Sequence, residues 1–463
     1  MKKSCFVFAT LLIFSLSSCN KDQLSEQSSF SFSVFSDSKS EDINVSDSSM
    51  SESSSSIDSE HFGDYLIFDL LEDNTYEVSA ADLSISGSVY IPESYNGKPV
   101  TAIKEEGFKA CTQIQSISLP ETITIIKKQA FAYSSIYWAK LPNSILTIEE
   151  GAFLQNRFNN PFIIPDSLNS LGKVCFANCQ IEGIVFGNGL KTIPDGAFSG
   201  NYLTELTIPD NLETIESGAF ASNLLTSIHI GKNLETILGN PFANNYDLDE
   251  ITIDSSNHNF FIENDVLYSK NYKDLIMVFP HKNFDTFVVP DNTETIHASA
   301  FVKKMYSGNS GLKTLTLGEN LKTIERSAFA LTRLEEINMN DKLVSIGDNA
   351  FSYTPLKEVL IPDSVFSIGM GCFQSAGSLE TVKLPSGLET ISQQCFEGTT
   401  SLTDILIPRS IKSIRSSAFK NSTTSLSYEG TMEEWGQIEK SETWTNNNTT
   451  VICSDGIVNE VIV

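Results

Sequence analysis

The chain is poor in cationic side chains and has no long hydrophobic run. Of its 463 residues, 31 are Lys or Arg and 58 are Asp or Glu, so the formal net charge is −27. A surface of this sign repels phosphate backbones, which argues against nucleic acid as a partner. No apolar stretch reaches the roughly 18 residues that a transmembrane helix needs, so the sequence does not predict a polytopic membrane protein.

Cysteine and histidine are also scarce. The eight cysteines are too few and too scattered for a disulfide framework in a chain of this length. No metalloprotease, serine-hydrolase, phosphate-loop or dinucleotide-binding motif is present. The histidines share no spacing and lie at His61, His229, His258, His281 and His297. The sequence therefore predicts neither an enzyme nor a bound cofactor, and it leaves a surface hydrolase as an unsupported alternative.

The N-terminus has the features of an export signal. Lys2 and Lys3 precede an apolar stretch from Phe6 to Phe14, which leads into Leu16-Ser17-Ser18-Cys19. This stretch resembles the lipobox of bacterial lipoproteins, in which the cysteine becomes lipidated after cleavage. We expect a signal peptide over 1–18 and a lipid on Cys19 that attaches the protein to the outer side of a membrane. An ordinary secretory signal ending near Ser18 is the alternative.

Residues 19–61 are dominated by serine, interspersed with Asp and Glu and including the run Ser53 to Ser56. Such a segment buries too little apolar surface to offset the entropy lost on ordering. A flexible coil of about 40 residues reaches on the order of 35 Å. We therefore expect a disordered tether that holds a folded domain away from the membrane.

The rest of the chain is a repeat. Most steps between successive phenylalanines of the repeat are 22 or 23 residues, and a 28-residue step to Phe329 predicts a loop insertion around Lys303 to Ser310. A fixed period of this length is typical of a solenoid. The repeated residues are Phe108, Phe131, Phe153, Phe176, Phe198, Phe220, Phe242, Phe301, Phe329, Phe351, Phe373, Phe396 and Phe419.

One unit, residues 203–220, shows the pattern of a coil. Leu203, Leu206 and Ile208 alternate with polar residues, which predicts a short strand with one buried face. Pro209 ends that strand because it has no backbone N–H to donate. Leu212 and Ile215 then point inward again, and a tight turn brings Ala219 and Phe220 into the core.

The residue before the repeated phenylalanine is nearly always small, because coils stacked about 4.8 Å apart leave little room for a larger side chain there. This assigns Cys175, Cys372 and Cys395 to the core as small hydrophobes, rather than to a metal or redox site. Cys111 and Cys179 occupy matching turns three residues after a phenylalanine. We expect a small capping residue at that position.

The irregular segments define the expected domain organisation. We predict an N-terminal cap over 62–99, leucine-rich repeats over 100–428, and a C-terminal cap over 429–463 that closes with a hairpin. Within the repeats, the long step before Phe301 predicts one additional coil with a hairpin-bearing insertion over 255–290. The prediction is a solenoid of about 13–14 coils, because one coil alone buries too little to fold.

The unit Leu-x-x-Ile-x-Ile-Pro, followed by Leu-x-x-Ile-x-x-x-Ala-Phe, resembles the BspA-like leucine-rich repeat family of bacterial surface proteins. Three further segments are similar to ones common in that family: Gly97 to Val100, Val266 to Lys270 and Gly430 to Trp435. The resemblance implies a right-handed leucine-rich-repeat solenoid with parallel strands on its concave face. It also implies a location on the bacterial cell surface and a role in adhesion, with no particular ligand and no functional residues to carry over.

The outward side chains of the strands form the candidate binding surface. The position between the last two buried strand residues is usually polar, but it is apolar at Ile163, Val185, Leu360 and Leu406. The candidate ligand-binding residues are the group on three successive coils: Tyr137, Trp138, Lys140, Ile163 and Val185. Exposed aromatic and aliphatic side chains are common at protein interfaces. The alternative is that Trp138 packs over the N-terminal cap.

The acidic residues of one coil and the function of the protein each have two interpretations. Asp247, Asp249, Glu250 and Asp254 cluster on one coil, where a solvated acidic face is a simpler interpretation than a calcium site. The function that the sequence favours is a lipid-anchored adhesin that binds a host extracellular protein or another cell-surface macromolecule through the concave face of the solenoid. A cell-envelope spacer without a specific ligand is the main alternative.

Overall fold

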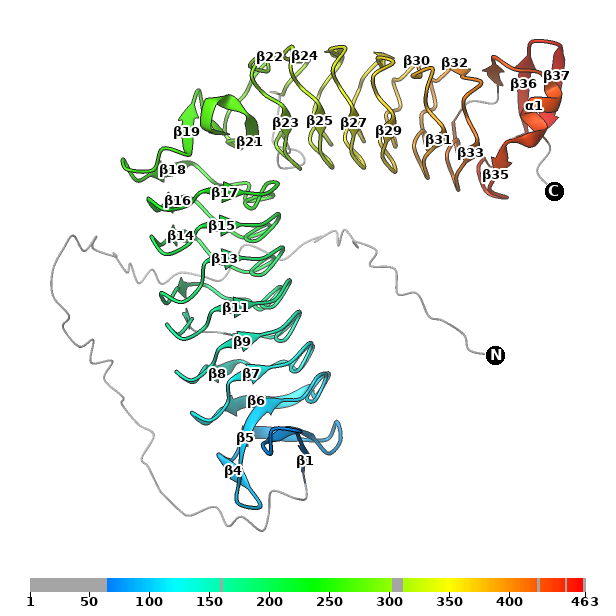
Figure 1. Ribbon diagram of the computed structural model, residues 1–463. Helices are drawn as coiled ribbons and strands as arrows, with labels where there is room; N and C mark the ends of the chain where they lie inside the picture. Colours follow the sequence, from blue (N-terminus) through cyan, green and yellow to red (C-terminus); the bar gives the residue numbers. More distant parts are fainter. Residues whose placement is uncertain (1–64, 159–160, 302–310, 423–424, 446–447, 461–463) are drawn as a thin grey trace, which may run out of the picture. The chain divides into compact units, whose positions relative to one another are not determined.

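The structure is a computed structural model that describes residues 65–158, 161–301, 311–422, 425–445 and 448–460. The expected signal peptide, Cys19, the tether over 19–61 and the loop around Lys303 to Ser310 lie outside these residues. Within the described part, the chain is a parallel β-solenoid with almost no helix, which confirms the predicted fold class. Successive coils lie parallel to one another in the series from β6 to β18 and again from β22 to β33 (Figure 1).

The solenoid has about 16 turns rather than the predicted 13–14. The difference arises at the ends. The caps also contribute strands that pair in register with the repeats, as β3 does with β6 and β36 does with β34. A phenylalanine count misses these turns because they have no phenylalanine in the repeated position.

Most coils contribute one strand to a row of parallel strands that we call the long ladder; among the described residues this row consists of several separately hydrogen-bonded sheets, and most of its strands end at a Pro or Gly turn. Its members are β3 (Ser86–Tyr90), β6 (Gln113–Ser118), β8 (Trp138–Lys140), β10 (Phe162–Ile163), β12 (Ile184–Val185), β14 (Glu205–Ile208), β16 (Ser227–Ile230), β18 (Glu250–Ile253), β22 (Thr286–Val288), β24 (Thr314–Thr316), β26 (Glu336–Asn338), β28 (Glu358–Leu360), β30 (Thr381–Lys383), β32 (Asp404–Ile407), β34 (Ser425–Tyr428) and β36 (Thr449–Cys453).

After the Pro or Gly turn, the chain forms a second parallel ladder, the short ladder, whose strands are mostly two residues long. Its members are β5 (Lys98–Ile103), β7 (Ile125–Ile126), β9 (Thr147–Ile148), β11 (Ser170–Leu171), β13 (Thr192–Ile193), β15 (Thr214–Ile215), β17 (Thr236–Ile237), β21 (Asp274–Val278), β23 (Thr295–Ile296), β25 (Thr323–Ile324), β27 (Ser345–Ile346), β29 (Ser367–Ile368), β31 (Thr390–Ile391), β33 (Ser413–Ile414) and β35 (Glu439–Lys440).

The remaining elements lie at the ends and in the insertion. They are β1 (Leu66–Leu70), β2 (Tyr76–Ala80), β4 (Ser94–Tyr95), β19 (Phe260–Glu263), β20 (Val266–Ser269), the 3-10 turn η2 (Lys270–Tyr272), the helix α1 (Met432–Gln437) and β37 (Gly456–Glu460). Neither of the described helices is long and apolar enough to cross a membrane.

The repeated phenylalanines form two stacks of buried rings. Phe108 and Phe131 have ring centroids 5.2 Å apart, and Phe351 and Phe373 have centroids 5.6 Å apart at an interplanar angle of 10°. The second stack ends on Trp444, which meets the ring of Phe419 edge-on at 6.0 Å. This spacing follows from the distance between coils, so the rings pack at van der Waals contact along each stack.

Most of the repeated phenylalanines sit in a tight turn between two left-handed residues. In the turn of Phe220 these are Gly218, with φ of 65°, and Ser222, with φ of 57°. The pattern recurs even where the residue is β-branched, as at Val174, which has φ of 48° and is strained by about 1–2 kcal/mol. The turns also bond to one another, since the Phe198 N–H donates to the carbonyl of Ala219 at 2.8 Å. Coil stacking therefore compensates for the local strain.

The position three residues after the phenylalanine carries a buried polar side chain in most turns. The Asn223 side chain donates to the carbonyls of Phe198 and Phe220, each at 3.0 Å, and accepts from the Leu203 N–H at 3.1 Å. It thus joins its own coil to the preceding one. Asn156, Asn201 and Asn245 bond in the same way.

Other residues replace asparagine at this position. The Cys179 thiol donates to the Phe153 carbonyl at 2.9 Å, which fits the expected capping role of this residue. In the later coils, Thr332, Thr354 and Thr399 each donate to the phenylalanine carbonyl of their own turn, and the Thr399 hydroxyl also bonds to the Ser422 hydroxyl of the next coil. The asparagine coils therefore have more bonds between coils at this position than the threonine coils.

The insertion separates two hydrophobic core clusters. β19, β20 and β21 form an antiparallel sheet, and β21 then continues the short ladder in parallel with β23. The facing residues Leu267 and Met277 belong to the N-terminal cluster, whereas Val266 and Val278, one position away, belong to the C-terminal cluster. The two faces of this sheet thus each complete one core.

The C-terminal end is covered by α1 and the β36–β37 hairpin. The helix was not predicted, although Thr431 and Glu434 form a capping box at its start. Trp435 is buried there, and its indole N–H donates to Glu460 on β37 at 2.7 Å. The last coil is therefore shielded from solvent by aromatic side chains.

Replacing Asn223 with Ala should lower the free energy of unfolding by about 1–3 kcal/mol, because the buried Leu203 N–H loses its acceptor and the carbonyls of Phe198 and Phe220 each lose one of two side-chain donors. Asn223→Thr should recover part of this loss, since threonine serves this position elsewhere. Chemical denaturation of the chain from residue 20 measures both. Asn233→Ala is the matched control at an exposed asparagine and should stay within about 0.5 kcal/mol of wild type. Equal effects at the two sites would contradict the role given to Asn223.

Gly218→Ala should cost about 1 kcal/mol of stability, because Gly218 has φ of 65°. The nearest atoms to an added Cβ are 3.8 Å away, so the cost would be conformational and not steric. Gly436 in α1 has open space around it, and Gly436→Ala should instead stabilise by about 0.5–1 kcal/mol. Opposite shifts in melting temperature are expected, and destabilisation by both would contradict this account.

The six described cysteines are buried free thiols. Burial raises the pKa of Cys179 to about 12 and that of Cys111 to about 11, so both stay protonated at neutral pH. In the chain from residue 20, we expect no fast reaction with a thiol-specific disulfide reagent until the protein unfolds, with Cys453 in the terminal hairpin reacting first. Rapid reaction of several thiols in the native protein would overturn this expectation.

Because folding raises these pKa values, stability should also fall as the pH rises above about 8.5.

Candidate functional site

The candidate site is the solvent side of the long ladder, which we call the outer face. Along each strand of this ladder, buried side chains alternate with exposed ones, as in β14, where Leu206 and Ile208 are buried and Glu205 and Thr207 are exposed. Parallel pairing then places equivalent outward residues side by side, for example Thr207, His229 and Thr252. Residues 22 or 23 positions apart in sequence therefore become neighbours on one surface.

The structure places the five predicted residues in two groups on this face. Ile163 and Val185 are directly paired on β10 and β12 and are 66% and 56% exposed. Tyr137, Trp138 and Lys140 lie on or next to β8, and both aromatic side chains are 43% exposed. In the described part of the chain no ladder pair joins β8 to β10.

The coils that carry these two groups are nevertheless bonded to each other. The Arg157 N–H donates to the Ile136 carbonyl at 2.8 Å, just before the two strands begin. Trp138 itself lies on a ladder strand with its ring partly in solvent, and it is not one of the described core residues. The two groups therefore belong to successive coils of one face.

Sequence reasoning missed three apolar residues at the same outward position. Tyr90, Val288 and Ile452 are large exposed hydrophobic side chains on β3, β22 and β36. Each lies between the last two inward residues of its strand, so the rule that identified Ile163 also applies to them. They were missed because their coils depart from the regular phenylalanine repeat. Tyr90 is in register with Ser118, and Ser118 with Lys140, which places it near the predicted group.

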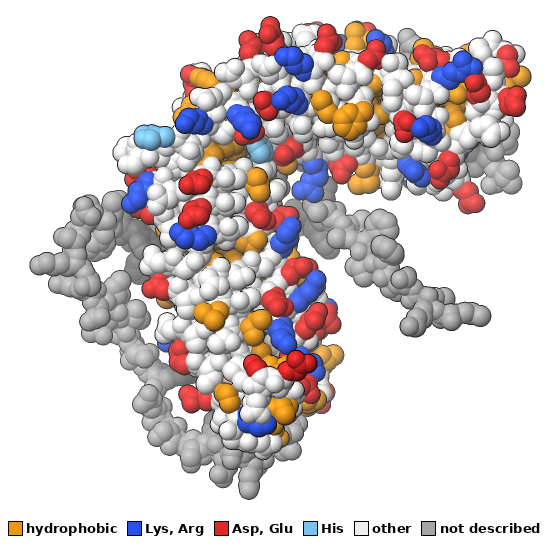
Figure 2. Space-filling model, in the orientation of Figure 1, with side chains coloured by type: hydrophobic (Ala, Val, Ile, Leu, Met, Phe, Trp, Pro, Cys, Tyr) orange, Lys and Arg blue, Asp and Glu red, His pale blue; other side chains and the backbone are white. Residues whose placement is uncertain are grey.

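Charge is distributed unevenly along the outer face. The first five strands, β3, β6, β8, β10 and β12, contain no Asp or Glu. Carboxylates appear from β14 onward, at Glu205, Glu250, Glu336 and Glu358. On the side of the molecule seen in Figure 2, cationic and anionic side chains are interspersed. The N-terminal end of the outer face is therefore uncharged except for Lys140, within a strongly acidic protein.

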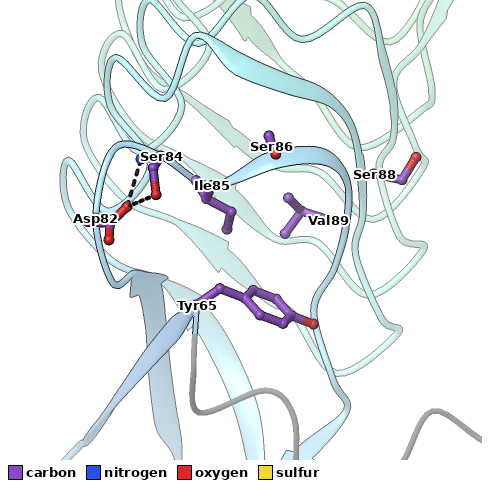
Figure 3. Close-up of a pocket in the computed structure, with 7 residues that line it drawn as sticks. All are labelled: Tyr65, Asp82, Ser84, Ile85, Ser86, Ser88 and Val89. Carbon is purple, nitrogen blue, oxygen red and sulfur yellow. Dashed lines mark hydrogen bonds between the residues drawn. The ribbon is translucent and has the colours of Figure 1, made fainter.

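A cavity of about 430 Å³ opens next to β3, the terminal strand of its sheet. Ser86 and Ser88 line it from the outward side of β3, and Ile85 and Val89 form its apolar part (Figure 3). The ring of Tyr65 lies across from them, and Asp82 and Ser84 lie at the other end. The cavity thus combines hydroxyls, one carboxylate and one aromatic ring.

The Asp82 carboxylate is held by its neighbour. It accepts bonds from the Ser84 hydroxyl at 2.5 Å and from the Ser84 N–H at 2.7 Å. These two bonds lower the pKa of Asp82, so it remains an anion and a hydrogen-bond acceptor at neutral pH. Ser88 connects the cavity to the next coil, because the Ser116 hydroxyl donates to its oxygen at 2.9 Å.

The residues considered for a metal site do not converge. Among the described residues, no three His, Cys, Asp or Glu side chains are placed to hold a metal ion. In the acidic group, Asp249 faces His281 at 3.2 Å, and Asp254 accepts from the Ser256 N–H at 2.8 Å. His229 lies on the outer face, 3.0 Å from the Thr252 hydroxyl. The alternative of a calcium site gains no support from this arrangement.

His297 is the one described histidine that is buried. Its two ring nitrogens lie 3.4 Å from Glu325 and 3.9 Å from Asp274, on opposite sides of the ring. An ion cannot bridge both carboxylates and one nitrogen in that geometry. His297 lies beside the insertion, on a coil of the short ladder, away from the outer face.

Comparisons with known proteins agree with the architecture. The BspA type leucine-rich repeat region matches this chain in six copies, over residues 87–202, 155–273 and 302–426. The pneumococcal vaccine antigen PcpA has a similar structure, with 22% identity and a TM-score of 0.50, over 84% of this chain and 96% of that one. Comparison with curated protein sequences gives no match.

A leucine-rich cell surface protein from Faecalibacterium prausnitzii A2-165 is also similar. The identity is 20% and the TM-score 0.52, over 80% of this chain and 95% of that protein. At these identities the likeness shows the fold and leaves the ligand open. Because the repeat region covers most of the chain and the observed coils have the same pattern, this chain belongs to the family of BspA type leucine-rich repeat proteins.

Proposed function

We infer that the chain is a bacterial surface protein that binds an extracellular macromolecule through the outer face of its long ladder. The observation that carries this proposal is the recurrence of exposed apolar side chains at one outward position, including the paired residues Ile163 and Val185. Scattered exposed hydrophobic residues need no explanation, but adjacent ones on a flat sheet form a contiguous surface suited to a partner.

Location outside the cell rests on the N-terminal sequence and on the family. Lys2, Lys3 and the apolar stretch to Phe14 lead to Cys19, where a lipid would attach the protein to the membrane. The serine-rich residues 19–61 would then separate the solenoid from the membrane. The six buried free thiols are compatible with this location, because a thiol that is buried and protonated is protected from oxidation.

The main alternative is a cell-envelope spacer with no specific ligand. A spacer needs a stable solenoid but places no demand on the outward side chains. The exposed aromatic and aliphatic residues of the outer face are therefore the feature that favours binding. A metal-dependent hydrolase would need a set of metal ligands, and among the described residues no three His, Cys, Asp or Glu side chains are placed to hold an ion.

The double variant Ile163→Ser and Val185→Ser should weaken binding to cells at least tenfold, because it removes adjacent apolar contacts without opening a core cavity. The measurement is flow cytometry of the labelled chain from residue 20 on bacterial and epithelial cells, with unlabelled chain as competitor. Leu224→Ser is the matched control, since Leu224 is 51% exposed at a position outside the outer face. Non-saturable binding by the wild-type chain would support the spacer instead.

A further inference from the structure

We propose that the N-terminal end of the outer face, together with the cavity beside β3, binds a neutral saccharide chain. This inference rests on the proposed function and specifies the ligand class and the part of the face involved. Its elements are three exposed aromatic rings, a set of uncharged hydrogen-bonding side chains between them, and one carboxylate at the end of the cavity. All lie on β3, β6 and β8 or directly before them.

The rings are Tyr90, Tyr137 and Trp138. Tyr90 is 51% exposed, and the other two are each 43% exposed. β6 lies between the strands that carry them, with Ser116 paired to Trp138 and Ser118 paired to Tyr90. Adjacent strands lie about 4.8 Å apart and the two residues are offset by two positions along the strands, so Tyr90 and Trp138 are spaced by roughly 12 Å. An aromatic face can pack against the C–H surface of a pyranose ring, and two faces at this separation suit successive parts of one chain.

Short polar side chains fill the space between the rings. The Ser116 hydroxyl bonds to Ser88, and the Tyr137 hydroxyl donates to the Gln115 side-chain oxygen at 3.2 Å. Serine hydroxyls and the glutamine amide can both donate and accept hydrogen bonds. Saccharide hydroxyls also do both, so this surface offers complementary partners for them without any charge. A protein partner with an apolar anchor would instead need a contiguous apolar pocket, which these interleaved hydroxyls do not provide.

The cavity beside β3 extends the same chemistry. Ser86 and Ser88 line it and also belong to the outward side of β3. Tyr65 contributes a fourth ring, and the ionised Asp82 is an acceptor for a pair of sugar hydroxyls (Figure 3). A concave site with an apolar floor and a few placed polar groups is the usual form of a small-ligand subsite. The cavity is therefore assigned to one end of the saccharide.

Charge selects between saccharide types. The long-ladder strands β3, β6, β8, β10 and β12 carry no carboxylate, and Lys140 is their only charged residue. A neutral chain needs no counter-charge on this surface. An acidic polysaccharide would have to approach a protein with a formal net charge of −27. A basic partner would be drawn to the carboxylates from β14 onward instead.

The direct test is affinity gel electrophoresis of the chain from residue 20 in gels containing xylan, mixed-linkage β-glucan, mannan or an α-glucan, with hyaluronan as the acidic probe. We expect retardation by at least one neutral polymer and none by hyaluronan. Trp138→Ala and Tyr90→Ala should each raise the dissociation constant for that polymer at least tenfold. Tyr202→Ala is the matched control, because Tyr202 is a similarly exposed tyrosine outside the outer face, and it should change nothing.

A second arm separates this inference from the proposed function. Binding of the same chain to immobilised cell-surface material is measured after periodate, which cleaves vicinal diols, and after protease. Loss on periodate alone supports the saccharide. Loss on protease alone, with no retardation in any neutral gel, overturns the saccharide while leaving surface binding in place. No saturable binding to untreated material overturns both. Circular dichroism melts that match the wild type exclude misfolding of the variants.

Discussion

The structure depends on the stacking of each coil against its neighbours. A single coil of 22 or 23 residues inserts only a few apolar side chains, and the entropy lost on ordering it is of comparable size. The neighbouring coil supplies what is missing: a ring for the phenylalanine stack, a carbonyl for the turn N–H, and partners for the buried polar side chain. Asn223 shows this most directly, because its amide bonds to carbonyls of two coils and its oxygen accepts from the earlier one.

The same stacking explains why unfavourable local conformations persist. Left-handed residues flank the phenylalanine in nearly every described turn, including Val174, for which that conformation is costly. Glycine relieves the cost at Gly218 and at a few other turns, but most coils use larger residues. The hydrogen bonds between turns and the ring stacks are therefore strong enough to impose one turn geometry on many different sequences.

Because the core and the turns are built from other residues, the side chains of the outer face can be selected for function. Inward residues of the long ladder are committed to the core, and the turns are committed to stacking. The outward residues do not fill the core, so rings, hydroxyls and charges can be placed on them without loss of the fold. The uncharged aromatic end on β3, β6 and β8, and the acidic stretch beginning at β14, are two such surfaces on one scaffold.

The sequence alone predicts the repeat, the buried phenylalanines, the small residue before them and the outward position of Ile163 and Val185. These follow from periodicity, because any residue type that recurs every 22 or 23 positions occupies the same place in each coil. The short ladder, the left-handed turn residues, the helix α1 and the cavity beside Tyr65 were decided by tertiary structure. They depend on which coils are neighbours and on the end of the stack at β3. Neither can be predicted from the pattern within one coil. Tyr90 belongs with these, since only pairing with β6 places it near Trp138.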